Sequence, residues 1–241
     1  MILIIRELDF FKSEEKEKFK LNMPSKLRLR YVFRPVVKLI AKGLSKIGVS
    51  PNFATIIMFA FAISSVIFLL FMPRPLNLVI FAILIFITGI MDGVDGAIAR
   101  LTDKSTQFGG FFDSVMDRLS EFVIFFGLLI YCWNQKLWTL IDVKLIVLTS
   151  FLATLMISYM RSRAENFYRG DFDVGLMGRS ERLFFLFISS LIAYFYGHYN
   201  ELLFLFMLLV IGTAIFRYIK ISRQLKLQKN EEVKTQENSL N

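Results

Sequence analysis

Six long apolar segments are the feature that most constrains the fold of this chain. They fall at residues 52–72, 76–100, 108–132, 143–159, 182–196 and 202–219. Each is close to the ~20 residues that a helix needs to cross a lipid bilayer. The 241-residue chain is 55% hydrophobic and contains 27 Phe, which leaves little sequence for a second soluble domain. The sequence therefore predicts an all-α integral membrane protein with six transmembrane helices.

The segments that flank the spans predict one membrane domain with short additions at its ends. Residues 1–23 are expected to be a cytoplasmic extension, and residues 50–221 to form the six-helix domain. Between them, residues 24–49 alternate apolar side chains with Arg and Lys. This pattern is typical of an amphipathic juxtamembrane helix that lies along anionic head groups, although an ordinary solvated helix is the alternative. Residues 222–241 are expected to be a basic and polar cytoplasmic tail.

Basic residues indicate how the chain is oriented. Most Lys and Arg outside the spans fall before the first span, between spans two and three, between spans four and five, and after the sixth. By the positive-inside rule these regions face the cytoplasm. Both termini are therefore expected on the cytoplasmic side of the cell membrane, with Trp133 and Trp138 at the outer interface.

Four aspartates interrupt the apolar pattern on either side of the connection between the second and third spans. They are Asp92, Asp95, Asp113 and Asp117. A charged residue inside a membrane costs about 2.5–3.5 kcal/mol on insertion scales, so four acids together need a compensating cation. The stretch contains no His or Cys, and oxygen-only ligands favour Mg²⁺, Mn²⁺ or Ca²⁺ over zinc or copper. We therefore predict a paired-metal site of the kind that clamps a phosphoryl group, opening to the cytoplasm.

Small residues accompany these acids at helical spacing. Gly96 and Ala99 share a face with the first two aspartates if the helix over 76–100 is continuous. Gly109 precedes the other two aspartates at positions i, i+4 and i+8 of the next helix. Two helical faces with small residues can approach each other closely, so the two pairs of acids are expected to face one another. Helix capping or close packing would explain any one of these residues, but not the whole set.

The complete set resembles the signature of the CDP-alcohol phosphotransferases. In this chain the signature reads Asp92-xx-Asp95-Gly96-xx-Ala99-Arg100-x8-Gly109-xxx-Asp113-xxx-Asp117, without a departure. The resemblance implies that an acceptor hydroxyl attacks the lipid-bearing phosphate of a CDP-linked lipid and displaces CMP. It also implies that the four aspartates bind metal, Mg²⁺ or Mn²⁺ with two ions per site, and that Asp117 is also the general base.

The resemblance further implies a binding site for the CDP-linked lipid. Its members in this chain are Asn52, Thr55, Gly96, Arg100, Thr106 and Gly109. Gly96 lets the backbone approach a phosphate, and Arg100 can bind one through two donors. For the residues at the start of the first span, a Ser or Asn helix cap is the alternative role.

The acceptor is predicted from arginines at three span ends. The sequence resembles the phosphatidylinositol-phosphate synthase branch of the family, including its archaeal archaetidylinositol-phosphate relatives, in which three basic residues hold the phosphate of inositol 1-phosphate. They correspond here to Arg161, Arg182 and Arg217. Arg161 replaces the Lys of bacterial members, which keeps the charge but changes the contact geometry. The expected reaction is metal-dependent transfer of a phosphatidyl-type group, built on diacylglycerol or archaeol, to inositol 1-phosphate in phospholipid biosynthesis.

Other acceptors, and a function from another class of protein, remain as alternatives. Glycerol 3-phosphate, free inositol, or inositol phosphate with CDP-inositol as donor would use the same chemistry. A divalent-cation transporter is the alternative from a different class, but it would distribute its acids along a path through the bilayer. The expected partners are the CDP-linked lipid, the acceptor, membrane lipids and a second copy of the chain in a homodimer; nucleic acid is not expected.

Two further polar residues have expected roles of their own. Glu121 lies one turn beyond Asp117, where it can pair with Arg118 or orient the acceptor, and a structural role is expected. His198, the single His of the chain, falls in an outer connection and is expected to be a surface residue.

Overall fold

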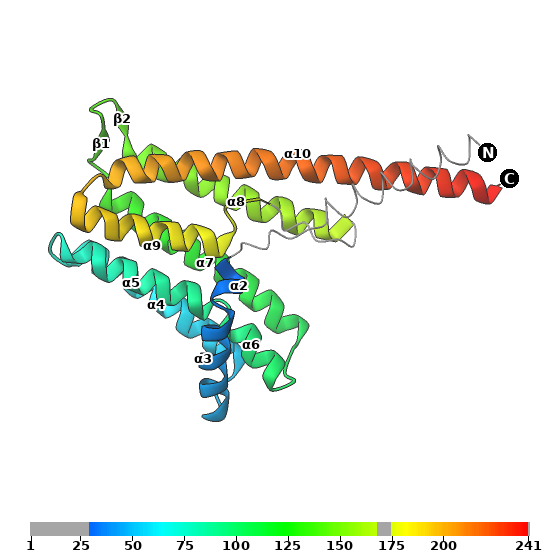
Figure 1. Cartoon of the computed structure of the whole chain (residues 1–241), viewed down its shortest axis with the longest axis horizontal. Helices are drawn as coiled ribbons and strands as arrows, with labels where there is room; N and C mark the ends of the chain where they lie inside the picture. Colours follow the sequence, from blue (N-terminus) through cyan, green and yellow to red (C-terminus); the bar gives the residue numbers. More distant parts are fainter. Residues whose placement is uncertain (1–28, 168–174, 241) are drawn as a thin grey trace.

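Long helices make up almost all of the computed structural model, which describes residues 29–167 and 175–240 (Figure 1). The elements are α2 (Leu29–Val32), α3 (Arg34–Lys46), α4 (Pro51–Phe71), α5 (Leu76–Met91), α6 (Val94–Leu101), α7 (Gln107–Tyr131), β1 (Lys136–Leu137), β2 (Ile141–Asp142), α8 (Val143–Phe167), α9 (Arg179–Tyr196) and α10 (Tyr199–Leu240). The predicted all-α architecture is confirmed, apart from the small β1–β2 hairpin, which the sequence did not predict. The extension expected over residues 1–23 lies outside the described residues.

Four helical segments in the described part of the chain are long and apolar enough to cross a membrane. They are Pro51–Phe71, Leu76–Leu101, Val143–Phe167 and Tyr199–Lys226. The other two expected spans correspond to α7 and α9, which carry too much charge to belong to this set: Asp113, Asp117, Arg118 and Glu121 on α7, and Arg179, Glu181 and Arg182 on α9. The protein is thus a multi-pass membrane protein, and these charges set α7 and α9 apart from its four more apolar helices.

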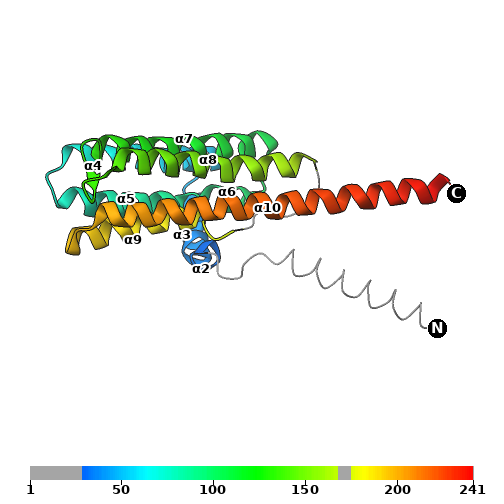
Figure 2. The same cartoon turned by 90° about the horizontal axis from the view of Figure 1, so that it is seen from above.

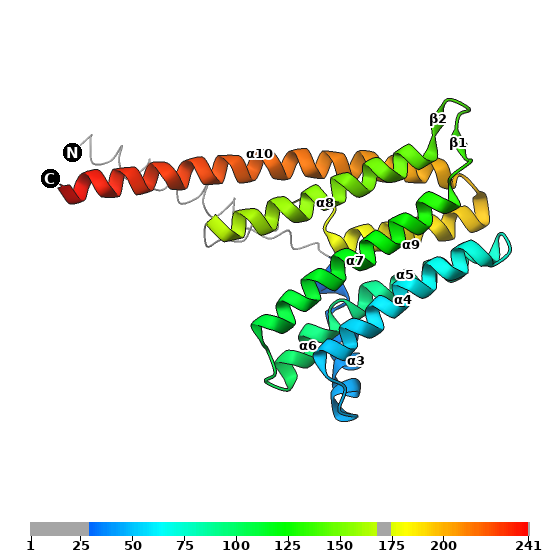
Figure 3. The same cartoon turned by 180° about the vertical axis from the view of Figure 1, so that it is seen from behind.

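The helices pack side by side around one main core. Its fully buried members include Phe81 and Ile85 of α5, Leu128 of α7, Leu186 of α9 and Phe206 of α10. Figure 3 shows α8 running beside α10, and α4 beside α5. Membrane helices approach closely where small residues line their interface. Gly127 is such a position in α7, because a Cβ atom there would lie 2.5 Å from Cγ1 of Val66 in α4.

A second, smaller core joins α3 to α6. Ala41 of α3 is fully buried and belongs to one cluster with Met58 of α4 and Ile98 of α6. On the solvent side of α3, Lys38 and Lys42 are exposed. The helix is therefore amphipathic, as its sequence pattern indicates, and its apolar face covers the short helix that follows Asp92.

The helix expected over residues 76–100 is not continuous. The regular helix α5 ends at Met91, and α6 begins at Val94. At the break, the Gly93 N–H donates to the Ile90 carbonyl oxygen at 3.2 Å, three residues back instead of four. A Cβ atom at Gly93 would lie 3.3 Å from Cγ1 of Val37, so α3 packs closely against this point. The segment thus consists of two helices joined at Asp92 and Gly93, rather than the one continuous helix on which the shared face of Asp92 and Asp95 was predicted.

The last helix extends well beyond the bundle. α10 contains 42 residues, about 63 Å at 1.5 Å per residue. Figure 2 shows its C-terminal part running past the ends of the other helices. Residues 222–240, expected as a basic and polar tail, continue this helix.

Candidate active site

Three aspartates converge where α5 ends and α7 passes it. One carboxylate oxygen from each of Asp92, Asp113 and Asp117 lies within 4.8 Å of the others. Asp113 and Asp117 occupy successive turns of α7, so their predicted helical stripe is confirmed. Within the described ranges, no group donates a hydrogen bond to the buried Oδ1 of Asp113. Three carboxylates this close, one with an unsatisfied oxygen, fit a hard divalent cation such as Mg²⁺ or Mn²⁺.

The fourth aspartate, Asp95, is oriented by the first span. Its side chain is buried, and its Oδ2 accepts a hydrogen bond from Thr55 Oγ1 at 2.6 Å. Thr55 lies on α4 and is only 2% exposed. A residue expected to contact the CDP-linked lipid therefore acts in this structure on the carboxylate of Asp95.

A cavity of about 710 Å³ opens over these acids. Its polar lining combines Asp92, Asp95, Asp113 and Asp117 with Gly96 and Arg100 of α6 and with Arg161, Arg179, Arg182 and Arg217. These last four arginines come from α8, α9 and α10, so the cavity joins the acidic signature to cations from the second half of the chain. Cavities of roughly 300–1,000 Å³ are typical of small-molecule sites.

Arg179 is a candidate site residue that the sequence analysis did not select. It is the first residue of α9, and its Nη1 forms ion pairs with Oδ1 of Asp92 and Oδ1 of Asp117. Its side chain is 11% exposed. A cation at a helix N-terminus is disfavoured by the helix dipole, so an arginine there indicates acidic partners from elsewhere in the fold. The sequence analysis placed the start of this span at residue 182, so the position of Arg179 at the helix start became visible only in the structure.

Arg182 of α9 and Glu121 of α7 form a buried ion pair. Each lies about one helical turn beyond Arg179 and Asp117, respectively. Nη2 of Arg182 contacts Oε1 of Glu121, and both side chains are 2% exposed. Nη1 of Arg182 also donates a hydrogen bond to the Met177 carbonyl oxygen at 3.0 Å. The partner of Glu121 is thus Arg182 of α9 rather than the suggested Arg118 of its own helix.

The remaining two predicted acceptor residues approach the cavity from α8 and α10. Nε of Arg161 lies 2.7 Å from Oε1 of Glu165, and the Arg161 side chain is 40% exposed. Arg217 is buried and donates from Nη1 to the Ile157 carbonyl oxygen at 2.9 Å. Together with Arg182, both line the cavity that contains the aspartates.

Three residues expected at the CDP-linked lipid meet where α4 and α7 begin. Thr106 caps α7, since its Oγ1 accepts a hydrogen bond from the Gly109 N–H at 3.0 Å. A Cβ atom at Gly109 would lie 3.1 Å from Thr106 Oγ1 and 3.5 Å from Asn52 Oδ1. Gly109 therefore allows the two helix starts to come together. The cap suggested for the first span is confirmed at Ser50, whose side chain accepts a hydrogen bond from the Phe53 N–H at 3.3 Å.

Comparison with known proteins agrees with this arrangement. Residues 48–219 match the sequence model of the CDP-alcohol phosphatidyltransferases. This match covers well over half of the chain, and the protein belongs to the CDP-alcohol phosphatidyltransferase family. It is accordingly a membrane-bound transferase that acts in phospholipid biosynthesis.

Similar proteins include synthases of inositol-containing lipids. The chain is 36% identical over 173 residues to archaetidylinositol phosphate synthase of Pyrococcus horikoshii, covering 70% of this chain and 82% of that protein. It is 33% identical over 158 residues to phosphatidylinositol phosphate synthase of Mycobacterium marinum, covering 64% and 63%. The fold is similar to that of Mycobacterium tuberculosis phosphatidylinositol phosphate synthase with CDP-DAG bound, with a TM-score of 0.65, 23% identity, and coverage of 78% of this chain and 94% of that one. The same mycobacterial protein in complex with manganese and citrate also matches with a TM-score of 0.65, at 23% identity over 77% of this chain and 88% of that one.

Proposed function

We propose that this protein transfers the phosphatidyl-type group of a CDP-linked lipid to inositol 1-phosphate and releases CMP. One observation carries the proposal: a single cavity contains both the acidic signature and arginines from α8, α9 and α10. The similarity to archaetidylinositol phosphate synthase supports this acceptor. The lipid of the donor is of the diacylglycerol or the archaeol type.

The aspartates are proposed to hold two Mg²⁺ or Mn²⁺ ions. The oxygens of Asp92, Asp113 and Asp117 lie close enough to share a cation, and Asp95 lines the same cavity. Bound divalent metal would neutralise charge on the diphosphate and on the leaving CMP. A manganese complex is known for the structurally similar mycobacterial protein, which supports the assignment.

The donor is proposed to bind beside α6 and the starts of α4 and α7. Gly96 and Arg100 line the cavity next to the aspartates, where a backbone and a guanidinium can both contact a phosphate. The cluster formed by Asn52, Thr106 and Gly109 is proposed to receive the nucleotide. Thr55 contributes by orienting Asp95.

Asp117 is proposed to accept the proton of the attacking hydroxyl. Its carboxylate lies in the cavity and is oriented by Arg179. As the acceptor oxygen bonds to the lipid-bearing phosphorus, the bond from this phosphorus to the CMP oxygen breaks, and the acceptor proton moves to the carboxylate. The proton transfer keeps positive charge from building up on the attacking oxygen.

The cations of the cavity favour a phosphorylated acceptor. Arg161, Arg182 and Arg217 are proposed to form the acceptor-phosphate site, and Arg179 joins them at the acidic cluster. Guanidinium groups bind phosphate through paired, charge-assisted hydrogen bonds. An acceptor without a phosphate, such as free inositol or serine, would not form these paired contacts with the guanidinium groups.

Six spans are proposed, with the cavity and both termini on the cytoplasmic side. Although α7 and α9 carry charges, both contribute to the main core between the four more apolar helices. The exposed lysines of α3 would then face anionic head groups at the membrane surface. Exposed apolar side chains such as Phe122, Phe126 and Leu152 would contact acyl chains or a second copy in the proposed homodimer.

Removing divalent metal should reduce CMP release to background. The reason is that the clustered carboxylates repel one another and also repel the diphosphate unless a divalent cation lies between them. The measurement is CMP release from the CDP-linked lipid after treatment with a chelator, followed by addition of Mg²⁺, Mn²⁺ or Zn²⁺. Recovery is expected with the first two ions. Unchanged activity in excess chelator would exclude the metal assignment.

Inositol 1-phosphate should support CMP release, whereas inositol and serine should not. Purified protein in detergent with Mg²⁺ and a CDP-linked lipid would be offered each acceptor, with glycerol 3-phosphate as the phosphorylated alternative. Release with inositol 1-phosphate alone is the expected result. Release with glycerol 3-phosphate alone would keep the donor chemistry but refute the proposed acceptor.

Arg161→Gln should raise KM for the acceptor by about tenfold or more, because one charge-assisted hydrogen bond is worth roughly 1.5–3 kcal/mol. KM for the CDP-linked lipid should change little. Arg163→Gln is the matched control, since Arg163 lies on the same helix but stacks on Phe167, 4.6 Å from the ring centre. Equal effects of the two substitutions would show that Arg161 does not bind the acceptor.

A further inference from the structure

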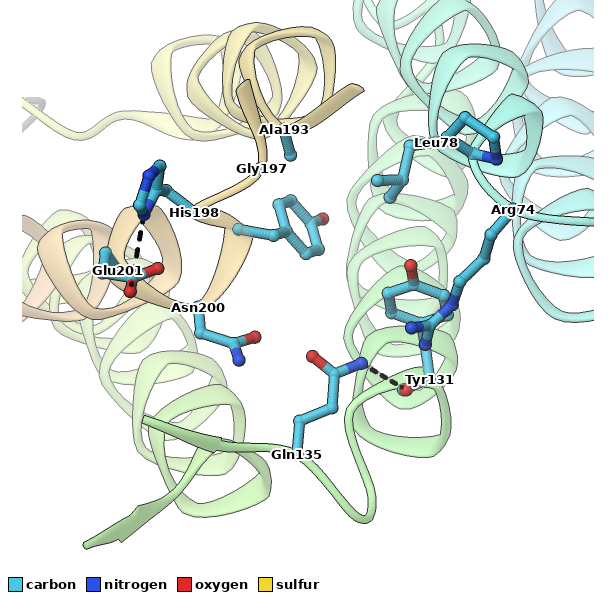
Figure 4. Close-up of a pocket in the computed structure, with 11 residues that line it drawn as sticks. Arg74, Leu78, Tyr131, Gln135, Ala193, Gly197, His198, Asn200 and Glu201 are labelled. Atoms are coloured by element: carbon cyan, nitrogen blue, oxygen red, sulfur yellow. Dashed lines mark hydrogen bonds and ion pairs between the residues drawn. The ribbon is translucent and has the colours of Figure 1, made fainter. Parts of the chain in front are cut away.

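Figure 4 shows a second cavity, of about 380 Å³. It lies at the opposite end of α5 from Asp92. Three connections form it: Arg74 and Pro75 between α4 and α5, the end of α7 with Gln135, and the turn from α9 into α10 at Gly197. The 16 residues of α5 separate Arg74 from Asp92, which is about 24 Å along the helix. This cavity is therefore distinct from the active site.

One wall of the second cavity carries its cation. The Arg74 guanidinium carbon lies 4.6 Å from the centre of the Tyr131 ring. Gln135 donates a hydrogen bond from Nε2 to the Tyr131 carbonyl oxygen at 3.0 Å, which fixes its side chain beside this ring. A guanidinium held against an aromatic ring keeps N–H donors available for an anion.

The facing wall is the start of α10. The first N–H groups of a helix have no intrahelical partner, and this end of the dipole is positive. Oδ1 of Asn200 is buried there and accepts no hydrogen bond from the residues that the structure describes. The one carboxylate of the lining, Glu201, is directed to His198, with 3.7 Å between Oε1 and Nδ1 (Figure 4). The cavity thus offers a phosphate the Arg74 guanidinium on one side and the N–H groups of the helix start on the other, while Asn200 Oδ1 can accept a hydrogen bond from a hydroxyl group.

Exposed apolar side chains surround this end of the bundle. Leu76 is 46% exposed, and Phe195 and Tyr196 at the end of α9 are 72% and 78% exposed. Trp133 and Trp138, in the neighbouring connection, are also exposed. Tryptophans are enriched at the head-group level of membranes. A polar cavity with one cation, at head-group depth and next to exposed apolar residues, matches the two parts of a phospholipid.

We propose that this cavity binds the phosphate-bearing head group of an anionic phospholipid in the leaflet opposite the active site. Arg74 binds the phosphate, Gln135 and Asn200 hydrogen-bond to the polar head group, and Leu76, Phe195 and Tyr196 contact the acyl chains. The apolar surroundings favour a lipid over a free phosphate ion. The site does not depend on which acceptor the active site uses.

The test is binding of dioctanoyl phosphatidylglycerol to the purified full-length protein in detergent, measured by native mass spectrometry. Arg74→Gln should weaken binding at this site by about tenfold or more, as expected for loss of a charge-assisted hydrogen bond. Lys136→Gln removes the same charge from an exposed residue of the same end of the molecule and should leave binding unchanged. CMP release should be the same in both variants and the wild type.

Two further measurements keep the proposal open to refutation. Asn200→Leu should also weaken lipid binding, independently of any effect that Arg74→Gln has on folding. Inorganic phosphate at concentrations similar to that of the lipid should not displace it. Equal affinity in the wild type, Arg74→Gln and Asn200→Leu would overturn the proposal, and displacement by phosphate would show a site for a free anion instead.

Discussion

Asp117→Asn should lower kcat by about 10²–10⁴-fold, the usual contribution of a general base, while the protein still binds the CDP-linked lipid. The substitution preserves the shape of the side chain and an oxygen that can contact Arg179, but an amide cannot accept the proton of the acceptor hydroxyl. Donor binding is proposed to rest mainly on the other aspartates and on α6. The measurement is single-turnover CMP release, combined with direct binding of the CDP-linked lipid.

Asp103→Asn is the matched control for this substitution. Asp103 is an exposed acid in the connection between α6 and α7, with a φ of 51°. Asn tolerates this left-handed conformation as well as Asp does, so the control removes one negative charge without strain. Its activity should equal that of the wild type. If Asp117→Asn lost donor binding to the same extent as turnover, Asp117 would be a donor-binding residue and not the base.

Glu121→Ala should lower the free energy of unfolding by about 3–5 kcal/mol, because it leaves the buried Arg182 cation without its counter-charge. Both side chains are 2% exposed, and the hydrogen bond from Arg182 to the Met177 carbonyl oxygen cannot neutralise the charge. The measurement is denaturant-induced unfolding in detergent micelles, followed by helical circular dichroism. The pair joins α7 to α9 one turn from Asp117 and Arg179, so loosening it should also reduce turnover.

Two variants define what the buried pair does. Asp142→Ala breaks a partly exposed pair with Lys144 and should cost about 0–1 kcal/mol. Glu121→Leu combined with Arg182→Met should recover most of the lost stability, since both charges are removed together.

A Glu121→Ala protein as stable as Asp142→Ala would refute the structural role of the buried pair. An unchanged acceptor KM in the double variant would show that Arg182 supports the site without binding the acceptor phosphate.

The helices, and the shared face of Asp113 and Asp117, could be predicted from the sequence because both depend on local patterns. An apolar run of about 20 residues has to satisfy its own backbone polar groups in a membrane, which makes it a helix. Acids at i and i+4 of one helix then lie on one face, as Asp113 and Asp117 do on α7. The break at Gly93 could not be predicted in this way, since it depends on Val37, which packs against it from α3.

The parts of the site that escaped prediction depend on contacts between distant helices. Arg179 and the pair of Glu121 with Arg182 link α7 to α9, and nothing in either segment alone specifies its partner. Spacing also did not show that Thr55 hydrogen-bonds to Asp95 across α4 and α6. The second cavity is likewise built from three connections that are far apart in the sequence.

The most direct test of the proposed transfer is to identify its lipid product. Purified protein would be incubated with Mg²⁺, a CDP-linked lipid and isotopically labelled inositol 1-phosphate, and the extracted lipids and the aqueous phase analysed by mass spectrometry. The proposed transfer predicts a labelled lipid that contains the phosphatidyl-type group joined to inositol phosphate, with one CMP for each lipid formed. CMP release without a labelled lipid, or label found only in a water-soluble product, would contradict it.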